Sequence, residues 1–183
     1  MTTKKTLVIT LDDFIFEHYK IKQNIWKNIA KEQKLKLTDT FLMGHYDAHL
    51  DKREKLEREY RLIAPYVSEV EARYQKVVSS TLLEPAIKPD HLEKLYQWAN
   101  DFDLYFITNH RIEQIKNLLE KAKIELDVDH IYSSKQVLNA KPEADIYLKI
   151  ARLQKIKPNT MIILDATING VQASHLANAK GLF

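Results

Sequence analysis

Polar side chains that can bind a phosphate group or a cation follow apolar runs at three places in the chain. They are Asp12, Asp13, Thr108, Asn109 and Asp165. Lys141, which precedes an amphipathic segment, can join them. Carboxylates, a hydroxyl and an ammonium group together suit a phosphate monoester with a divalent cation. The residue types therefore predict chemistry on a phosphorylated substrate, provided that the fold brings these side chains together.

The apolar runs before these residues predict buried strands. The strands are expected at residues 6–11, 104–107 and 161–164, with a weaker signal at 131–132. Amphipathic helices are predicted between them, over 112–119 and 146–153. Strands that alternate with helices predict an α/β fold with a parallel sheet, in which ligands bind beyond the carboxyl ends of the strands.

Residues 16–85 show no strong strand pattern and are predicted to be helical. We expect them to form a helical insertion after the first strand, while residues 1–15 and 86–183 form the α/β core. Pro85 and Pro89 suit the connection back to the core. Pro89 and Asp90 also predict the start of a helix, with Asp90 as its N-cap.

A plainer interpretation is that each polar residue at a strand end caps the helix that follows. Asp, Thr and Asn are favoured N-cap residues, so any one of them fits that role. Their order along the chain and the sequences around them favour a shared site instead.

Four short segments carry this order. They are residues 8–15 (VITLDDFI), 106–109 (FITN), 141–147 (KPEADIY) and 164–173 (LDATINGVQA). Together they resemble the four motifs of the haloacid dehalogenase (HAD) superfamily, specifically members with a helical cap after the first strand, such as phosphoglycolate phosphatase and β-phosphoglucomutase. The resemblance covers nearly the whole chain. It implies a three-layer, Rossmann-like parallel sheet with residues 16–85 as the cap.

The resemblance also implies a role for each candidate residue. Asp12 stands where the family keeps its general acid/base, and Thr108, followed by Asn109, stands where a hydroxyl holds a phosphoryl oxygen. Lys141 matches the motif lysine, which also contacts phosphate. Thr10 occupies the position of the nucleophilic aspartate, and this is the main departure from the family pattern.

A threonine at the nucleophile position changes the expected activity. Its hydroxyl needs an adjacent base or metal before it can attack phosphorus. Loss of the nucleophile lowers turnover by roughly 10⁶ in another hydrolase. We therefore expect a catalytically impaired protein, a pseudoenzyme, in which Thr108, Asn109 and Lys141 still bind phosphate.

Mg²⁺ is the cofactor that the resemblance implies. Its expected ligands are the side chain of Asp165 and the main-chain carbonyl of Asp12. The aspartate that Thr10 replaces would be a further ligand, and Leu164 replaces an acid that some members carry. Because one carboxylate remains, we expect Mg²⁺ to bind weakly or not at all.

The composition argues against several classes of partner. Lys and Arg number 28 against 25 Asp and Glu, which gives a net charge of +3 and no basic footprint for nucleic acid. No cysteine occurs, which excludes disulfides and fits a cytoplasmic protein. No run of about 18 apolar residues is present, so no membrane span is expected.

Two other functions stay open. One is an active hydrolase in which Asp12 or Asp13 activates water on a metal held with Asp165. The other is a non-catalytic interaction module whose pocket is closed by side chains such as Phe14. Members of the family that the chain resembles usually continue into another sheet strand at this point, whereas the sequence stops at Phe183. We therefore expect strand 161–164 to lie at or near a sheet edge that a second copy of the chain or a local element covers.

Overall fold

A computed structural model describes residues 4–37, 61, 64–79 and 87–183 of the chain. The chain divides into two compact units, of which the first joins Met1–Phe16 to Ala86–Phe183 and the second is Glu17–Pro85. That the second unit acts as a cap stays a prediction.

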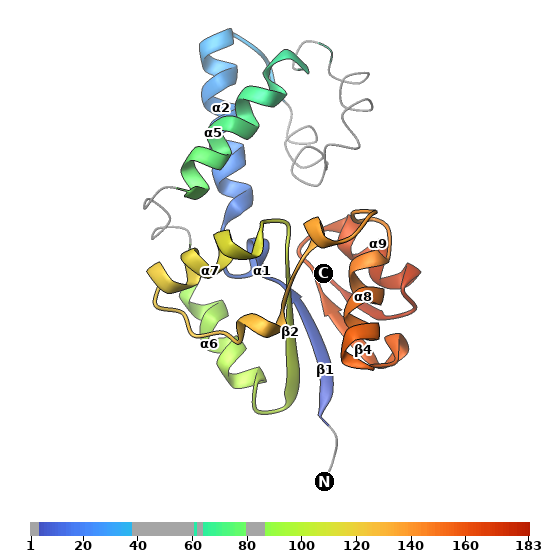
Figure 1. Ribbon diagram of the computed structural model, residues 1–183. Coiled ribbons are helices and arrows are strands. Elements are labelled where there is room, and N and C mark those ends of the chain that lie inside the picture. Colours follow the sequence, from blue (N-terminus) through green and yellow to red (C-terminus); the bar gives the residue numbers. More distant parts are fainter. Residues whose placement is uncertain (1–3, 38–60, 62–63, 80–86) are drawn as a thin grey trace. The chain divides into compact units, whose positions relative to one another are not determined.

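The first unit contains a five-stranded sheet (Figure 1). Its strands are β1 (Lys5–Thr10), β2 (Phe102–Thr108), β3 (Ile131–Ser133), β4 (Met161–Leu164) and β5 (Lys180–Leu182). They are arranged in the order β3-β2-β1-β4-β5, and every neighbouring pair is parallel. The predicted α/β fold with a parallel sheet is confirmed.

Strand β1 lies at the centre of this sheet, as its apolar sequence requires. Ile9 pairs with Phe106 of β2 on one side and with Leu164 of β4 on the other. Because the strands are parallel and in this register, their carboxyl ends reach the same edge. Thr10 ends β1, and Asp165 directly follows β4. The sheet therefore places the polar ends of its strands side by side.

Helices cover both faces of the sheet. They are α1 (Leu11–Phe14), α6 (Pro89–Trp98), α7 (Ile112–Lys121), α8 (Asp145–Gln154) and α9 (Ile168–Leu176), with short 3₁₀ turns η4 (Val128–His130), η5 (Ser134–Gln136) and η6 (Pro158–Thr160). Figure 1 shows α6 and α7 on one side of β1 and β2, and α8 and α9 on the other. Right-handed connections that run in opposite directions from a central strand produce this arrangement.

The core beneath α8 and α9 is apolar. Val8, Ile107 and Ile163 extend from three strands into one cluster with Ile146 and Ile150 of α8, all of them fully or almost fully buried. Successive strand residues point to opposite faces, so Leu7, Ile9 and Phe106 face the other way. Burial of such side chains holds the strand ends in place.

One expectation about a helix start was wrong. Helix α6 begins with Pro89 after the N-cap Lys88, so Asp90 is inside the helix rather than its N-cap. Proline fits this first position because the first helical N–H has no partner within the helix. Strand β4 lies next to the sheet edge, as expected, and a local element covers it, because residues 180–182 form β5 and pair with β4. Association with a second copy stays a prediction.

The second unit contains two described helices, α2 (His18–Gln33) and α5 (Val67–Ser79), preceded by the 3₁₀ turn η2 (Ala64–Tyr66). Ile25 and Ile29 of α2 and Val70 of α5 are buried. Arg73 of α5 donates two hydrogen bonds to Glu32 of α2, at 3.1 and 2.9 Å. The helical character predicted for this segment is thus found where the structure describes it.

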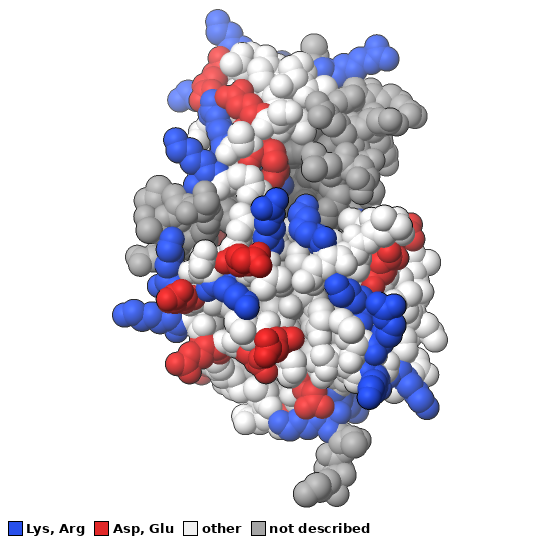
Figure 2. Space-filling view, in the orientation of Figure 1, with Lys and Arg blue, Asp and Glu red and all other residues white. Residues whose placement is uncertain are grey.

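Charged side chains are mixed rather than segregated on the face drawn in Figure 2, where Lys and Arg alternate with Asp and Glu among the residues described. None of the helices in the described part of the chain is both long enough and apolar enough to cross a membrane.

Candidate active site

The carboxylate of Asp165 is the centre of the first group of polar side chains. Its Oδ2 atom accepts hydrogen bonds from Thr10 Oγ1 at 2.5 Å, Lys141 Nζ at 2.7 Å and Tyr147 Oη at 3.0 Å. Its Oδ1 atom accepts from the backbone nitrogen and the hydroxyl of Thr167, at 3.0 and 2.6 Å. We call these residues the Asp165 cluster. The fold thus brings Thr10, Lys141 and Asp165 together.

Local structure explains why each donor points inward. Thr10 is the N-cap residue of α1 but makes no capping bond with its side chain, so its hydroxyl is free to reach Asp165. Thr167 is the N-cap of α9, where its hydroxyl accepts from Gly170 N and donates to Asp165. Tyr147 lies in the first turn of α8, six residues after Lys141.

Burial makes these contacts strong. The exposed fraction is 3% for Lys141 and 1% for Asp165. Burial by itself raises the pKa of the Asp165 carboxyl, but the charge and hydrogen bond of Lys141 and the hydrogen bonds from Thr10 and Thr167 lower it further than burial raises it. The net pKa lies below the usual range, so Asp165 is ionised at neutral pH.

Tyr147 keeps its proton in the same surroundings. Burial, the charge of Asp165 and the hydrogen bond to Asp165 raise the pKa of its hydroxyl well above the usual value. Tyr147 is therefore a permanent donor to Asp165 and cannot serve as a base near neutral pH.

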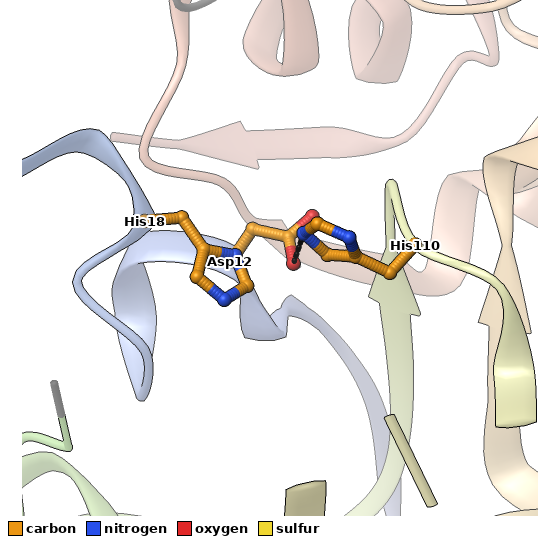
Figure 3. A group of neighbouring side chains, drawn as sticks. All are labelled: Asp12, His18 and His110. Carbon is orange, nitrogen blue, oxygen red and sulfur yellow. Dashed lines mark ion pairs between the residues drawn. The ribbon is translucent and has the colours of Figure 1, made fainter. Parts of the chain in front are cut away.

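The carboxylate of Asp12 is the centre of a second group. Thr108 Oγ1 donates to its Oδ1 atom at 3.0 Å, and the backbone nitrogen of Asn109 donates to Oδ2 at 2.6 Å. His110 Nε2 lies 3.8 Å from Oδ1, and Figure 3 shows the two side chains pointing toward each other. We call these four residues the Asp12 cluster. His18, also drawn in Figure 3, belongs to the second unit of the chain.

The three expected phosphate-binding residues contact two different carboxylates. Thr108 and Asn109 contact Asp12, while Lys141 contacts Asp165. The side chain of Asp13 lies outside what the structure describes. The capping interpretation does not explain the arrangement, because the N-caps of α7 and α9 are Arg111 and Thr167.

Sequence reasoning missed three members of the two clusters. Tyr147 was interpreted as part of the apolar face of its helix, where its buried ring does lie, but its hydroxyl reaches Asp165. Thr167 had a detectable signal, namely a Thr three residues before Gly170 at the start of a helix. His110 was not among the candidate residues, and it is buried beside Asp12.

Comparison with known proteins identifies the family of the chain. The family model of haloacid dehalogenase-like hydrolases matches residues 6–183. The chain belongs to this family. No curated protein sequence matches it.

Solved HAD structures share the fold at low sequence identity. A HAD family hydrolase from Deinococcus radiodurans with bound phosphate and sodium is 18% identical, with 97% of this chain and 79% of that chain covered and a TM-score of 0.71. The β-phosphoglucomutase of Clostridium difficile is 18% identical, with 98% and 83% covered and a TM-score of 0.66. A haloacid dehalogenase-like hydrolase from Streptococcus pneumoniae is 18% identical, with 99% and 84% covered and a TM-score of 0.71.

HAD hydrolases generally use Mg²⁺, and the residues of the Asp165 cluster do not fit that ion as they lie. A carboxylate offers about four lone-pair sites. In Asp165 the two oxygens already accept five hydrogen bonds, one of them from an ammonium group. Mg²⁺ needs near-ideal octahedral oxygen coordination, and Thr10 brings no second carboxylate. The ammonium of Lys141 supplies the positive charge beside Asp165.

Proposed function

We propose that this HAD-family chain is a phosphatase-like protein that does not carry out covalent phosphoryl transfer and retains at most the binding of a small phosphorylated metabolite. One observation carries the proposal. At the position of the family's nucleophile, the hydroxyl of Thr10 donates a 2.5 Å hydrogen bond to Asp165.

The electrostatics of Asp165 support this proposal, because a nucleophilic hydroxyl needs a base that will take its proton. Asp165 is the acceptor of the Thr10 proton, but its lowered pKa makes it a weak base. The ammonium of Lys141, 2.7 Å from the same oxygen, further disfavours protonation of the carboxylate. Thr10 therefore stays a neutral alcohol.

The same contacts support weak or absent Mg²⁺ binding as part of the proposal. A metal ion at Asp165 would have to displace Lys141 or several neutral donors from a buried carboxylate. A cytoplasmic location, expected from the absence of cysteine, completes the proposal.

The binding part of the proposal depends on groups that are chemically suited to phosphate oxygens. Thr108 and Asn109 offer a hydroxyl and a backbone N–H, and Lys141 offers a cation. In the structure these groups contact Asp12 and Asp165, so a phosphate must compete with internal carboxylates for them.

Hydrolysis of p-nitrophenyl phosphate tests the catalytic part. We expect wild type with Mg²⁺ to show no turnover above that of the buffer, because loss of the nucleophile lowers the rate of another hydrolase by a factor of roughly 10⁶. Thr10→Asp restores the missing carboxylate. Measurable turnover in that variant would support a phosphatase site that has lost only its nucleophile. Robust wild-type turnover that disappears in Asp165→Ala would contradict the proposal and favour the metal-dependent hydrolase.

A further inference from the structure

Three groups from one short segment converge on the carboxylate of Asp12. The hydroxyl of Thr108 and the backbone N–H of Asn109 each donate to a different oxygen, at 3.0 and 2.6 Å. The imidazole of His110 lies 3.8 Å from the first oxygen. A hydroxyl and an amide N–H are donors that proteins use to bind oxoanions, whereas the imidazole of His110 is too far from Oδ1 for a hydrogen bond. Two donors therefore hold the carboxylate of Asp12 as they would hold a bound oxoanion.

These donors are held in place by contacts other than those with Asp12. The hydroxyl of Thr108 accepts from the backbone nitrogen of His110 at 3.1 Å, which directs its own proton toward Asp12. The hydroxyl of Ser133 donates to the carbonyl of His110, and the hydroxyl of Ser134 donates to Asn109 Oδ1 at 3.0 Å. Ser133 and Ser134 come from the end of β3 and the turn after it. These contacts, none of which involves Asp12, help to hold the donor set in place.

We infer that Asp12 is an internal ligand of the donors on Thr108 and Asn109, beside His110, and that an external phosphate must displace it. The inference rests on the proposed function, since it takes phosphate binding at Thr108 and Asn109 as its starting point. It adds that competition from the carboxylate of Asp12 lowers the apparent affinity for phosphate.

Displacement is required because the two anions need the same donors. A phosphate on Thr108 and Asn109 would stand where the oxygens of Asp12 now lie, and two like charges at hydrogen-bonding distance repel each other. Phosphate therefore binds only to molecules in which the side chain of Asp12 has moved away. The apparent affinity is the affinity of those molecules multiplied by the fraction of the protein that they represent.

Titration of the full chain with inorganic phosphate, followed by calorimetry, tests the inference. Asp12→Asn removes the charge and keeps the shape of the side chain. We expect it to bind phosphate at least about tenfold more tightly than wild type, since charged hydrogen-bond acceptors outcompete neutral ones. The control is Asp103→Asn, an exposed aspartate at the opposite end of β2, which should bind as wild type does.

A second substitution locates the bound phosphate. In the Asp12→Asn background, Thr108→Val removes one donor at nearly constant volume, and the gained affinity should be lost. Equal affinity of wild type and Asp12→Asn would overturn the inference, and so would a gain that survives Thr108→Val.

The outcomes separate this inference from the proposed function. Wild-type phosphatase turnover would contradict the proposed loss of chemistry without bearing on the affinity ratio. An absence of phosphate binding in both wild type and Asp12→Asn would overturn the inference, while the loss of covalent chemistry would stand.

A measurement on wild type covers the case in which the Asp12 variants do not fold. Saturating phosphate should shift the NMR resonances of the Asn109 backbone amide and of the Asp12 carboxyl carbon together, because one event moves both. Phosphate binding that leaves both resonances unchanged would overturn the inference.

Discussion

The ammonium of Lys141 lies 2.7 Å from Asp165 Oδ2, and both side chains are almost completely buried. The charge of Lys141 lowers the pKa of the Asp165 carboxyl and so favours its ionised form. The desolvation penalty nearly cancels their attraction, so the pair adds little net stability, whereas removal of one partner leaves an uncompensated charge in the core.

Lys141→Met should therefore be strongly destabilising. We expect the free energy of unfolding to fall by about 3 to 5 kcal/mol, the range measured when one member of a buried ion pair is removed. Urea denaturation measures the change. Lys116→Met, at an exposed position of α7, is the control and should shift stability by less than about 0.5 kcal/mol. A loss below about 1 kcal/mol for Lys141→Met would show that the pair is not maintained in solution.

The lowered pKa of Asp165 predicts a loss of stability in acid. Folding favours the carboxylate, so its contribution is complete above the ordinary pKa of 3.8 and disappears as the pH falls through the lower pKa of the folded state. The free energy of unfolding should thus decrease between about pH 5 and pH 2. In Asp165→Asn this decrease should be smaller, as measured by urea denaturation at several pH values. An unchanged slope would assign the acid sensitivity to other carboxyls, and Asp103→Asn should retain the wild-type slope.

The sheet was predictable from sequence because the physical signal is local. Each strand is a compact apolar run, and the polar residues that end the runs must meet at one edge when the strands are parallel. Thr10 and Lys141, which the sequence places at or near this edge, both contact Asp165, and their role as a site stays a prediction. β5 escaped prediction because Lys180–Leu182 contains no such run and becomes a strand by pairing with β4.

Which carboxylate each of these side chains contacts could not be predicted in the same way. It depends on the direction in which side chains leave the strand ends, and sequence gives spacing rather than direction. Tyr147 shows the difficulty, since its ring fits the apolar pattern of α8 while its hydroxyl contacts Asp165. His110 was not a candidate for a similar reason, because the residues next to it in sequence do not indicate that it lies beside the buried carboxylate of Asp12.

Gly170→Ala should destabilise the protein although alanine favours helices. A Cβ atom at this position of α9 would lie 1.9 Å from Asp165 Cγ and 2.2 Å from both carboxylate oxygens. The carboxylate cannot move aside cheaply, because Thr10, Lys141 and Thr167 hold it. We expect a loss of about 1 to 3 kcal/mol, typical of overpacking, in place of the usual gain of up to about 1 kcal/mol.

Urea denaturation of Gly170→Ala and of a control in the same helix tests this expectation. Gln172→Ala lies at an exposed position of α9 and should change stability by no more than about 0.5 kcal/mol. A more stable Gly170→Ala protein would mean that Asp165 is not fixed at the start of α9.

Thr10→Asp should make the thermal stability of the protein depend on Mg²⁺. In wild type, Thr10 Oγ1 is 2.5 Å from Asp165 Oδ2, so a carboxylate at position 10 would place two negative charges beside each other. Lys141 can neutralise one of them, and the other raises the energy of the folded state until a cation binds. We therefore expect Thr10→Asp to melt below wild type without Mg²⁺ and to recover when Mg²⁺ is added.

Thermal unfolding with and without Mg²⁺ measures this difference, and Thr10→Asn is its matched control because asparagine has the shape of aspartate without the charge. At a Mg²⁺ concentration ten times the dissociation constant, the Thr10→Asp midpoint should rise by about 3 to 6 °C. Wild type and Thr10→Asn should not respond. A wild-type rise as large as that of Thr10→Asp would mean that Asp165 exchanges its five hydrogen bonds for a metal, and the ammonium of Lys141 would then not be its counter-charge.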